Sequence, residues 1–347
     1  MLICTAEKIE DTKGGAMDSP SMPLVTVLMS PRERFSVAED TIANIFDNTS
    51  MLFELVVVDG GYPPHLRRRL ESSSRRRAFR LVRTDHYLSP NEARNLALSE
   101  VKTRYIAFVD NDLVVAPGWL EALVRCAEET GADVVSPVIC IGKPLHTIIH
   151  IAGGTVDINR TGDRRALSEV HLHSNARLDA VRHRLRREET GLAEFHCMLV
   201  RRSVFDRLGK LDEGLKATSE HIDLCLKVRQ SGGKVFLEPD ATVTYVPPPP
   251  LAVVDVPYYL LRWSDEWCVA SEKRLAETWN VDVSPDVLAW TPMHRRSAYP
   301  RIMTVAQRLL GWNRSMALLT KVERAVANRA ESRRTRAHET GAETAGA

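Results

Sequence analysis

Two aspartates separated by one asparagine follow a strongly apolar run of the chain. The segment Tyr105–Val115 reads YIAFVDNDLVV, so Asp110, Asn111 and Asp112 stand at the end of a predicted buried strand. Alternate side chains of an extended segment point to the same side, so both carboxylates can reach one ligand. Hard divalent cations prefer carboxylate oxygen, and such cations neutralise phosphate groups. The segment therefore indicates a site for a cation and a phosphate group, and the alternative is a turn that ends the strand.

A second group of titratable residues stands at 220–223, Glu-His-Ile-Asp, at the start of a predicted helix. An unperturbed histidine has a pKa of about 6.5, which suits His221 to act as a general base near neutral pH. Glu220 and Asp223 are three residues apart and share one helix face. Asp223 could orient Glu220 or His221, or accept the proton itself. The alternative is that both acids only bind the N-terminus of the helix and its dipole.

A glutamate and a histidine share one face of a later predicted strand. Glu194 and His196 alternate in EFHCMLVRR, residues 194–202, so their side chains point the same way. The pair could bind a metal ion or the hydroxyl groups of a ligand. The alternative is an ordinary strand histidine whose ring is hydrogen-bonded.

The elements that must position these groups alternate between strand and helix from residue 24 to residue 139. The strands are continuous apolar runs, which is typical of a parallel sheet covered on both faces, so the fold class is α/β. We predict strands at 24–30, 54–61, 79–84, 105–112 and 133–139, and helices at 36–48, 64–77, 89–101 and 117–129. In such sheets, ligands bind beyond the carboxyl ends of the strands. Ser30, Asp59 and Asp110 stand at such ends and should converge on one crevice.

The pattern changes after Gly142. Polar, glycine-punctuated sequence predicts hairpins and loops. Further predicted elements are a charged helix at 178–190, a strand at 194–202, a helix at 219–233 with Ser219 as its N-cap, and a strand at 234–246 that a tetraproline ends.

Bulk composition excludes several classes of protein. The net charge of the 347 residues is +2, which gives no general attraction for nucleic acid. The six cysteines form no CxxC pair, so neither a zinc knuckle nor a disulfide framework is indicated. No apolar run approaches the ~18–20 residues that cross a bilayer, and the N-terminus does not resemble a signal peptide. We expect a cytoplasmic protein with disordered ends at 1–22 and 336–347.

Several ordered segments carry a resemblance to glycosyltransferase family 2, whose members have the GT-A fold. These segments are VTVLMS, ELVVVDGG, NEARNLAL, YIAFVDNDLVVAPGWLEAL, LVRRSVFDRLGKLDEGL and SEHIDLCLKVRQSGG. The resemblance covers residues 23–250 and implies a Rossmann-like nucleotide-binding domain with a mostly parallel sheet flanked by helices. It also implies transfer of one sugar from a nucleotide-sugar, with inversion, assisted by Mn²⁺ or Mg²⁺. We expect a UDP-sugar as donor and a hydroxyl of a glycan, a lipid-linked sugar or a small metabolite as acceptor, as in polysaccharide biosynthesis.

The resemblance assigns a donor site by position. Asp59 would contact the nucleobase, and Arg94 would lie near the base or the diphosphate. Asp110 would contact the ribose or a metal-bound water, and Asp112 would bind the metal ion. The residues expected to bind the nucleotide-sugar are Ser30, Asp59, Arg94, Asp110 and Asn111.

Two of these assignments have structural alternatives. Asp59 could instead form an Asx-type turn before Gly60. Arg94 could be a surface arginine paired with Glu92 or Asp85.

The proton acceptor is where the chain departs from the family. Members usually carry Glu-Asp-x-Asp at the start of this late helix, and the second residue deprotonates the acceptor hydroxyl. Here His221 stands in its place. His221, Glu220 and Asp223 remain alternatives, and we place Glu220 first because its carboxylate keeps the usual chemistry. A degenerate protein that only binds a nucleotide-sugar or glycan is the alternative function.

A helical extension, residues 251–335, follows the tetraproline. Its segment YYLLRWSDEW contains Arg262 and Trp263, which resemble the Arg-Trp end of the QxxRW motif of processive family 2 synthases, although Tyr259 replaces the glutamine. An aromatic ring can stack on a sugar, which suits Trp263 to bind the acceptor, and Arg262 belongs to the same Arg-Trp motif. With Glu194 and His196, these are the candidate acceptor residues. The alternative is an amphipathic helix that packs on the sheet.

Residues 301–330 have an apolar stripe opposite arginine and lysine. Such a helix could lie on the inner, anionic face of a membrane, where lipid-linked acceptors are found. The alternative is a docked helix with one solvated face.

Overall fold

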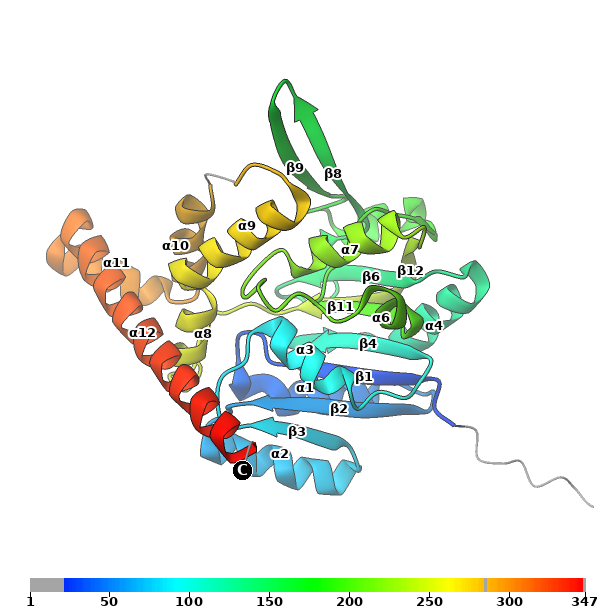
Figure 1. Ribbon diagram of the computed structural model, residues 1–347, viewed down its shortest axis with the longest axis horizontal. Helices are drawn as coiled ribbons and strands as arrows, with labels where there is room; N and C mark the ends of the chain where they lie inside the picture. The colour runs from blue at the N-terminus through cyan, green and yellow to red at the C-terminus, as the bar shows by residue number, and fades with distance from the viewer. Residues whose placement is uncertain (1–21, 284–285, 346–347) are drawn as a thin grey trace, which may run out of the picture.

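The computed structural model describes residues 22–283 and 286–345, so all but the last residue of the predicted lead 1–22 lies outside the described residues. A curved, mostly parallel sheet with the order β10-β12-β6-β11-β4-β1-β2-β3 forms the centre of the molecule (Figure 1). Its strands are β1 (Val25–Ser30), β2 (Phe53–Gly60), β3 (Arg80–Thr84), β4 (Tyr105–Asp110), β6 (Val134–Ile141), β10 (Glu188–Glu189), β11 (Cys197–Arg201) and β12 (Val235–Tyr245), with β5 (Leu113–Val115) paired to β12 and β7 (Ile149–Ile151) paired to β6.

The parallel strands bring the predicted strand ends to one edge. β1 pairs in parallel with both β2 and β4, and β12 pairs in parallel with β6. Ser30 and Asp110 are direct partners in the register of β1 and β4. β11 runs antiparallel between β4 and β6, so the residues that precede it arrive at this same edge. The α/β fold class is therefore confirmed.

Most of the helices that cover the sheet form where the sequence predicts them. They are α1 (Ala38–Asp47), α2 (Pro64–Arg77), α3 (Pro90–Leu98), α4 (Trp119–Thr130), α5 (Leu178–Val181), α6 (Ser203–Leu208) and α7 (Glu220–Gln230). α3 begins with a capping box between Ser89 and Glu92 and has Pro90 in its first turn. α3 packs on β1 and β2, which holds Arg94 against the strand ends.

The helix predicted at 178–190 is wrong. Only α5 and the 3-10 turn η2 (Arg182–Arg184) form, and β10 then pairs with the edge of β12. Leu178, Val181 and Leu185 are buried, but the residues between Val181 and Leu185 are basic and exposed. These three buried side chains hold a short turn against the core. The segment that follows pairs as β10 with the edge strand β12.

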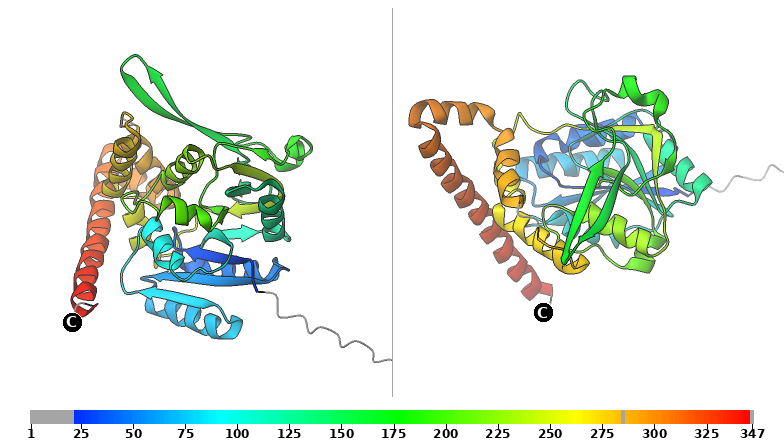
Figure 2. Two further views of the ribbon diagram at one scale, coloured as in Figure 1. Left: turned by 45° about the vertical axis from the view of Figure 1, so that its right-hand side comes forward. Right: turned by 90° about the horizontal axis from the view of Figure 1, so that it is seen from above.

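A two-stranded hairpin of β8 (Gly154–Thr161) and β9 (Arg164–His171) projects from the sheet beside α7 and α9, as both views of Figure 2 show. This confirms the predicted hairpin. Its base brings β9 residues close to the start of α7.

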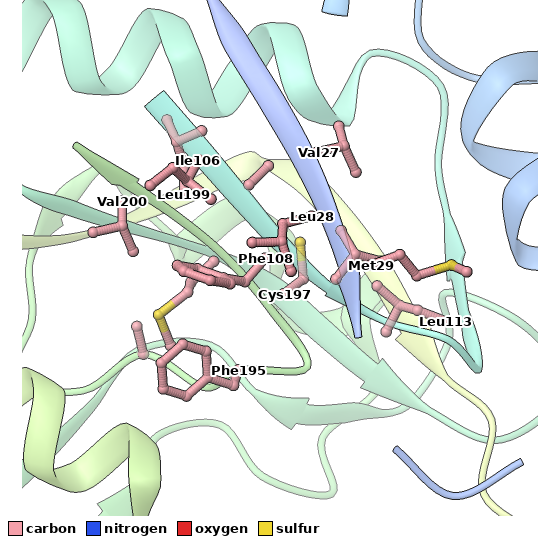
Figure 3. Packing of buried hydrophobic residues seen from close by; sticks show 14 of the residues in the cluster. Val27, Leu28, Met29, Ile106, Phe108, Leu113, Phe195, Cys197, Leu199 and Val200 are labelled. Atoms are coloured by element: carbon pink, nitrogen blue, oxygen red, sulfur yellow. The ribbon is translucent and has the colours of Figure 1, made fainter. Parts of the chain in front are cut away.

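One large apolar core extends along the central strands of the sheet. Side chains of β1, β4 and β11 interdigitate there, with Phe195 edge-on to Phe108 at 5.3 Å between ring centroids (Figure 3). The five cysteines within residues 22–283 are buried and unpaired.

The C-terminal extension has its own smaller core. It consists of α8 (Val256–Arg262), α9 (Asp265–Trp279), α10 (Val287–Ser297), α11 (Pro300–Leu310) and α12 (Trp312–Ala345). Tyr259, Trp263 and Trp267 lie in that core, and α12 packs along α8 at one side of the molecule (Figure 1). The continuous helix predicted at 301–330 is wrong because Gly311, with a φ of 73°, separates α11 from α12. α12 continues to Ala345, past the boundary predicted at residue 335.

Within the part of the chain that the structure describes, no helix combines the length and the apolarity that crossing a bilayer demands.

Candidate active site

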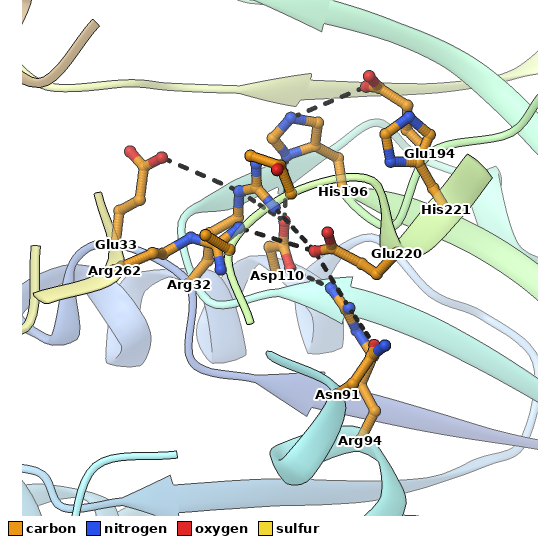
Figure 4. Close-up of polar contacts among 12 residues, drawn as sticks. Arg32, Glu33, Asn91, Arg94, Asp110, Glu194, His196, Glu220, His221 and Arg262 are labelled. Carbon is orange, nitrogen blue, oxygen red and sulfur yellow. Dashed lines mark hydrogen bonds and ion pairs between the residues drawn. The ribbon is translucent and has the colours of Figure 1, made fainter. Parts of the chain in front are cut away.

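Two buried arginines, Arg94 and Arg262, and the partly exposed Arg32 surround two buried carboxylates at the carboxyl edge of the sheet (Figure 4). Arg32 follows β1, Arg94 lies on α3, and Arg262 ends α8. Asp110 Oδ2 lies 3.3 Å from Arg32 Nε, and Asp110 Oδ1 lies 3.5 Å from Arg94 Nη2. Glu220 Oε1 lies 3.4, 3.7 and 3.9 Å from the nearest guanidinium nitrogens of Arg94, Arg262 and Arg32. Sequence segments more than 200 residues apart thus meet at one charged cluster.

The arginines control the ionisation of both acids. Burial opposes the charge on Asp110, but Arg32, His196 and Arg94 outweigh it and hold the pKa of this carboxyl below its ordinary value. Burial likewise opposes the charge on Glu220, but Arg262, Arg94 and Arg32 lower its pKa. Both carboxylates are therefore ionised at neutral pH. The alternative of a surface Arg94 is wrong, since its side chain is buried and lies over the ring of Phe195.

Arg262 has an unusual environment for a buried arginine. Its side chain is fully buried, yet none of its three guanidinium nitrogens makes a hydrogen bond within the described chain. Arg295, in the same extension, is also buried but bonds Glu323, Asp265 and the carbonyl of Trp263. Buried polar groups without partners are costly, so the unpaired donors of Arg262 point to a ligand with several acceptor oxygens.

Asp112 presents unpaired oxygens beside this cluster. Both carboxylate oxygens are buried and lack hydrogen bonds, and the nearest cationic atom, Arg34 Nε, lies 3.9 Å away. Burial and the charge of Glu33 raise the pKa of Asp112 to about 8. A divalent cation would relieve both the burial and the repulsion, so the residue fits the metal ligand predicted for it.

Glu33 was not singled out from the sequence. One of its oxygens accepts a bond from the indole of Trp263 at 3.0 Å and the other from the hydroxyl of Tyr245 at 2.7 Å. The glutamate therefore links the loop after β1 to β12 and to the extension.

The other predicted donor residues are held by the chain. Asp59 accepts bonds from the Tyr62 amide and from Arg67, both at 2.7 Å, so it forms the turn considered for it. The amide of Asn111 is fully engaged: it accepts from the Arg32 backbone and donates to the Arg34 carbonyl and to Tyr62.

Ser30 is buried, and its hydroxyl is one of the buried polar atoms without a partner. It lies beside Asp110 in the sheet.

A cavity of about 840 Å³ opens next to the arginine cluster. The hairpin, the segment before β11, the start of α7 and the extension line it. Five predicted site residues are among its lining: Glu194, His196, Glu220, His221 and Trp263. Arg32 also lines it, which connects the cavity to the charged cluster.

The three candidate bases differ in their surroundings. His221 Nε2 lies 2.9 Å from Glu169, and although burial favours the neutral ring, Glu169 raises the pKa of His221 to about 9. The imidazole is therefore protonated at neutral pH and cannot accept a proton. Asp223 binds Lys227 and the Trp279 indole and does not line the cavity. Glu220 is ionised and lines it.

Ser219, before α7, lies in the left-handed region with a φ of 69°. Its position as N-cap is confirmed, but its side chain makes no capping bond. Such strain in a residue other than glycine is typical of functional sites, and Ser219 lines the cavity.

Glu194 and His196 precede β11 in a turn rather than within the strand, since the Cys197 amide donates to the Glu194 carbonyl. Their side chains nevertheless converge: His196 Nε2 and Glu194 Oε2 are 3.8 Å apart, and His150 Nε2 lies 3.0 Å from the same oxygen. His150, Glu169 and Arg32 were not predicted as site residues, because only long-range pairing brings them here.

Comparisons with known proteins show the family of the chain. The model of the family described as Glycosyl transferase family 2 matches residues 26–209. An uncharacterized protein of Sinorhizobium fredii, y4gI, is 30% identical over 221 residues, which cover 60% of this chain but only 23% of that protein.

A solved structure shows likeness in fold. The crystal structure of GalNAc-T7 with UDP, GalNAc and Mn²⁺ covers 83% of this chain and 58% of its own, with a TM-score of 0.52 and 16% identity. A mannosyltransferase of Pyrobaculum calidifontis in complex with GDP-Man and Mn²⁺ covers 92% of this chain and 85% of its own, with a TM-score of 0.49 and 16% identity.

Proposed function

The chain belongs to glycosyl transferase family 2 and has the GT-A fold, and from this premise we propose that it transfers one sugar from a nucleotide-sugar to a hydroxyl acceptor with inversion. The observation that carries the proposal is the buried guanidinium of Arg262, which makes no hydrogen bond within the described chain and reaches Glu220 only at 3.7 Å, in a cluster that also holds Arg32 and Arg94. A diphosphate has the charge and the acceptor oxygens that this cluster lacks. The UDP and Mn²⁺ bound to GalNAc-T7 support a UDP-sugar as the first donor to test.

Asp112 would hold the metal ion, Mn²⁺ or Mg²⁺. Its two buried, unpaired oxygens fit a hard cation, and a phosphate group with water would complete the coordination. When bound, such an ion neutralises charge on the departing nucleoside diphosphate. Asp110 and Ser30 would contact the donor nearby, and Asp59 and Asn111 would act by holding the turns that shape this site.

Glu220 is the proposed general base. It lines the cavity, carries a negative charge at neutral pH, and starts α7 next to the arginines. Those arginines weaken it as a base in the free protein. A bound diphosphate would offset their charge and so raise the proton affinity of Glu220, which couples base strength to donor binding. The oxygen it deprotonates would attack the anomeric carbon directly, and one displacement inverts that carbon.

The acceptor would occupy the cavity of about 840 Å³. Trp263 offers an aromatic wall, and Glu194 and His196 offer polar contacts to hydroxyl groups. A glycan end, a lipid-linked sugar or a small metabolite fits this chemistry.

Donor turnover tests the proposal. Release of nucleoside diphosphate from UDP-, GDP-, dTDP- and CDP-sugars with Mn²⁺ should occur for one donor. Glu220→Gln should lower the rate about 10²–10⁴-fold while nucleotide binding is retained. Asp223→Asn is the matched variant on the same helix and should keep the rate within about tenfold. If the protein binds a nucleotide but turns over no donor, the alternative of a catalytically inactive binding protein is favoured. If Glu220→Gln retains full turnover, Glu220 is not the general base.

α11 and the start of α12 expose both apolar and basic side chains, which supports contact with a membrane surface. α11 has no buried residue, and Leu309 and Trp312 are 78% and 65% exposed. Residues 300–322 contain two arginines on α11, a further arginine and a lysine on α12, and no acid. An anionic bilayer would accept both the apolar side chains and the charge. The unpaired cysteines are consistent with the reducing cytoplasmic side, where we place the protein.

A further inference from the structure

We propose that His150, Glu194 and His196 form a site for one Zn²⁺ ion, separate from the cation site of Asp112. His150 lies on β7, and the other two residues lie in the turn before β11. One ligand atom from each residue lies within 4.8 Å of the others. β7 and β11 both pair with β6 on the edge opposite β12, so the fold itself brings the three residues together.

The contacts among these atoms are those of ligands that face a common point. Glu194 Oε2 lies 3.0 Å from His150 Nε2 and 3.8 Å from His196 Nε2. Ligand atoms around a tetrahedral Zn²⁺ with bonds of about 2.0–2.1 Å are separated by about 3.3 Å, which falls between these values. Glu194 Oε2 is buried, and its contacts to the two imidazoles lack the geometry of regular hydrogen bonds. The oxygen thus approaches two ring nitrogens closely from a direction that also suits a shared cation.

The surroundings orient the ligands. His196 lies between Asp110 and Glu194, with Nδ1 at 3.1 Å from Asp110 Oδ2, which leaves Nε2 to face Glu194 (Figure 4). A carboxylate behind a ligating imidazole is common at zinc sites. The His196 ring also stacks on Tyr245 at 4.2 Å, and both Glu194 and His196 are at least nine-tenths buried.

The donor set distinguishes this site from that of Asp112. Two imidazole nitrogens and one carboxylate suit Zn²⁺, whereas Mg²⁺ and Ca²⁺ prefer oxygen alone. Asp112 offers only carboxylate oxygen next to a predicted phosphate site. The two positions should therefore select different ions.

The fourth position would face the cavity. Glu194 and His196 line it, and His171 Nε2 approaches the other Glu194 oxygen at 3.6 Å from the hairpin side. Three protein ligands with an open position are typical of a zinc ion that binds a substrate group. Such an ion would hold a hydroxyl or carboxylate oxygen of the acceptor. This role rests on the proposed transferase function, whereas binding of the ion does not.

Zinc titration of the full-length protein without an affinity tag tests the site. Metal-free protein is titrated with Zn²⁺ against a chromophoric chelator, in the absence of nucleotide and sugar, and the bound metal is counted by mass spectrometry. The wild type should bind one equivalent. His150→Ala and Glu194→Gln should each weaken binding by at least about 100-fold, because loss of a ligand exceeds the effect of an outer-shell change. His183→Ala, an exposed histidine, and Asp112→Ala should bind as the wild type does.

Thermal unfolding shows whether each variant is folded, and the partly exposed His150 can be removed without opening the core. Absence of a stoichiometric ion in the wild type would overturn the proposal. So would unchanged affinity in both folded His150→Ala and Glu194→Gln, or loss of zinc in Asp112→Ala alone. None of these results depends on whether the protein transfers a sugar.

Discussion

Replacing Arg262 with methionine should leave the free protein about as stable as the wild type and remove most of its affinity for a nucleoside diphosphate. The reason is that the guanidinium is fully buried without a hydrogen bond, so the folded protein gains little from it until a ligand binds. A purely structural arginine would behave in the opposite way.

The magnitude follows from the contacts. Glu220 Oε1 lies 3.7 Å from Arg262 Nη2, which at an effective dielectric constant of about 20 is an attraction of about 4 kcal/mol. Against it stands the loss of hydration of a buried ion, several kcal/mol, which already includes the hydrogen bonds that the guanidinium does not make. These terms nearly cancel, and Glu220 keeps Arg94 as a partner, so the free energy of unfolding should change by less than about 2 kcal/mol.

The effect on binding should be large. A charge-assisted hydrogen bond contributes about 1.5–3 kcal/mol, so loss of two bonds to a diphosphate costs about 3–6 kcal/mol. The dissociation constant should therefore rise about 10²–10⁴-fold. Isothermal titration with the nucleoside diphosphate and Mn²⁺ measures this change, and urea unfolding of the free protein measures stability.

Arg295→Met is the matched control. Arg295 is equally buried in the same extension, but Glu323, Asp265 and a backbone carbonyl satisfy it. Removing it breaks these charge-assisted bonds, which contribute about 1.5–3 kcal/mol each, although Glu323 keeps Arg296 and Tyr299 as partners. The loss should cost about 3–5 kcal/mol of stability with nucleotide affinity unchanged. Our reasoning fails if Arg262→Met is destabilised as strongly as Arg295→Met while its nucleotide affinity stays that of the wild type.

Two further predictions concern other parts of the molecule. Asn111→Ala removes three hydrogen bonds that hold residues 32–34 and Tyr62. It should lower the free energy of unfolding, measured by urea titration, by about 3 kcal/mol. A loss under about 1 kcal/mol would show that Asn111 does not stabilise these residues. Leu309→Glu should reduce co-sedimentation with phosphatidylserine vesicles several-fold, while Leu172→Glu, an exposed leucine next to the hairpin, should not. Equal sedimentation of both variants, or concentration-dependent dimerisation lost only in Leu309→Glu, would assign α11 to another partner.

Local signals in the sequence explain why much of the fold could be predicted. The apolar runs that end at Ser30 and Asp110 fixed two parallel strands, and their direct pairing follows from the topology of such sheets. The helix predicted from residue 89 forms as α3, because Ser89, Pro90 and Glu92 form a local capping signal. The break at Gly311 was missed because the apolar stripe continues across it, and a lone glycine does not reveal its φ.

The site was only partly predictable, for a physical reason. Asp110, Asp112 and Glu220 stand in recognisable segments, whereas Arg32, Glu33 and His150 depend on contacts across the sheet. Arg32 and Glu33 belong to the segment PRERF after β1, for which the sequence predicts no role. Two consecutive charged residues directly after a buried strand, at the carboxyl edge, were the signal that could have found them. The pairing of His221 with Glu169 could not be predicted from the sequence, because it forms only when the β8–β9 hairpin packs next to α7.

Thermal unfolding with UDP, GDP, dTDP and CDP, each with Mn²⁺ or with EDTA, tests the central claim most directly, with Asp112→Asn beside the wild type. Our account predicts that one nucleotide stabilises the wild type only when Mn²⁺ is present, by about 2.7 kcal/mol at 100 times its dissociation constant, and does not stabilise Asp112→Asn. Equal stabilisation in EDTA or in Asp112→Asn would contradict the metal–diphosphate site, and no stabilisation by any nucleotide would contradict the donor site as a whole.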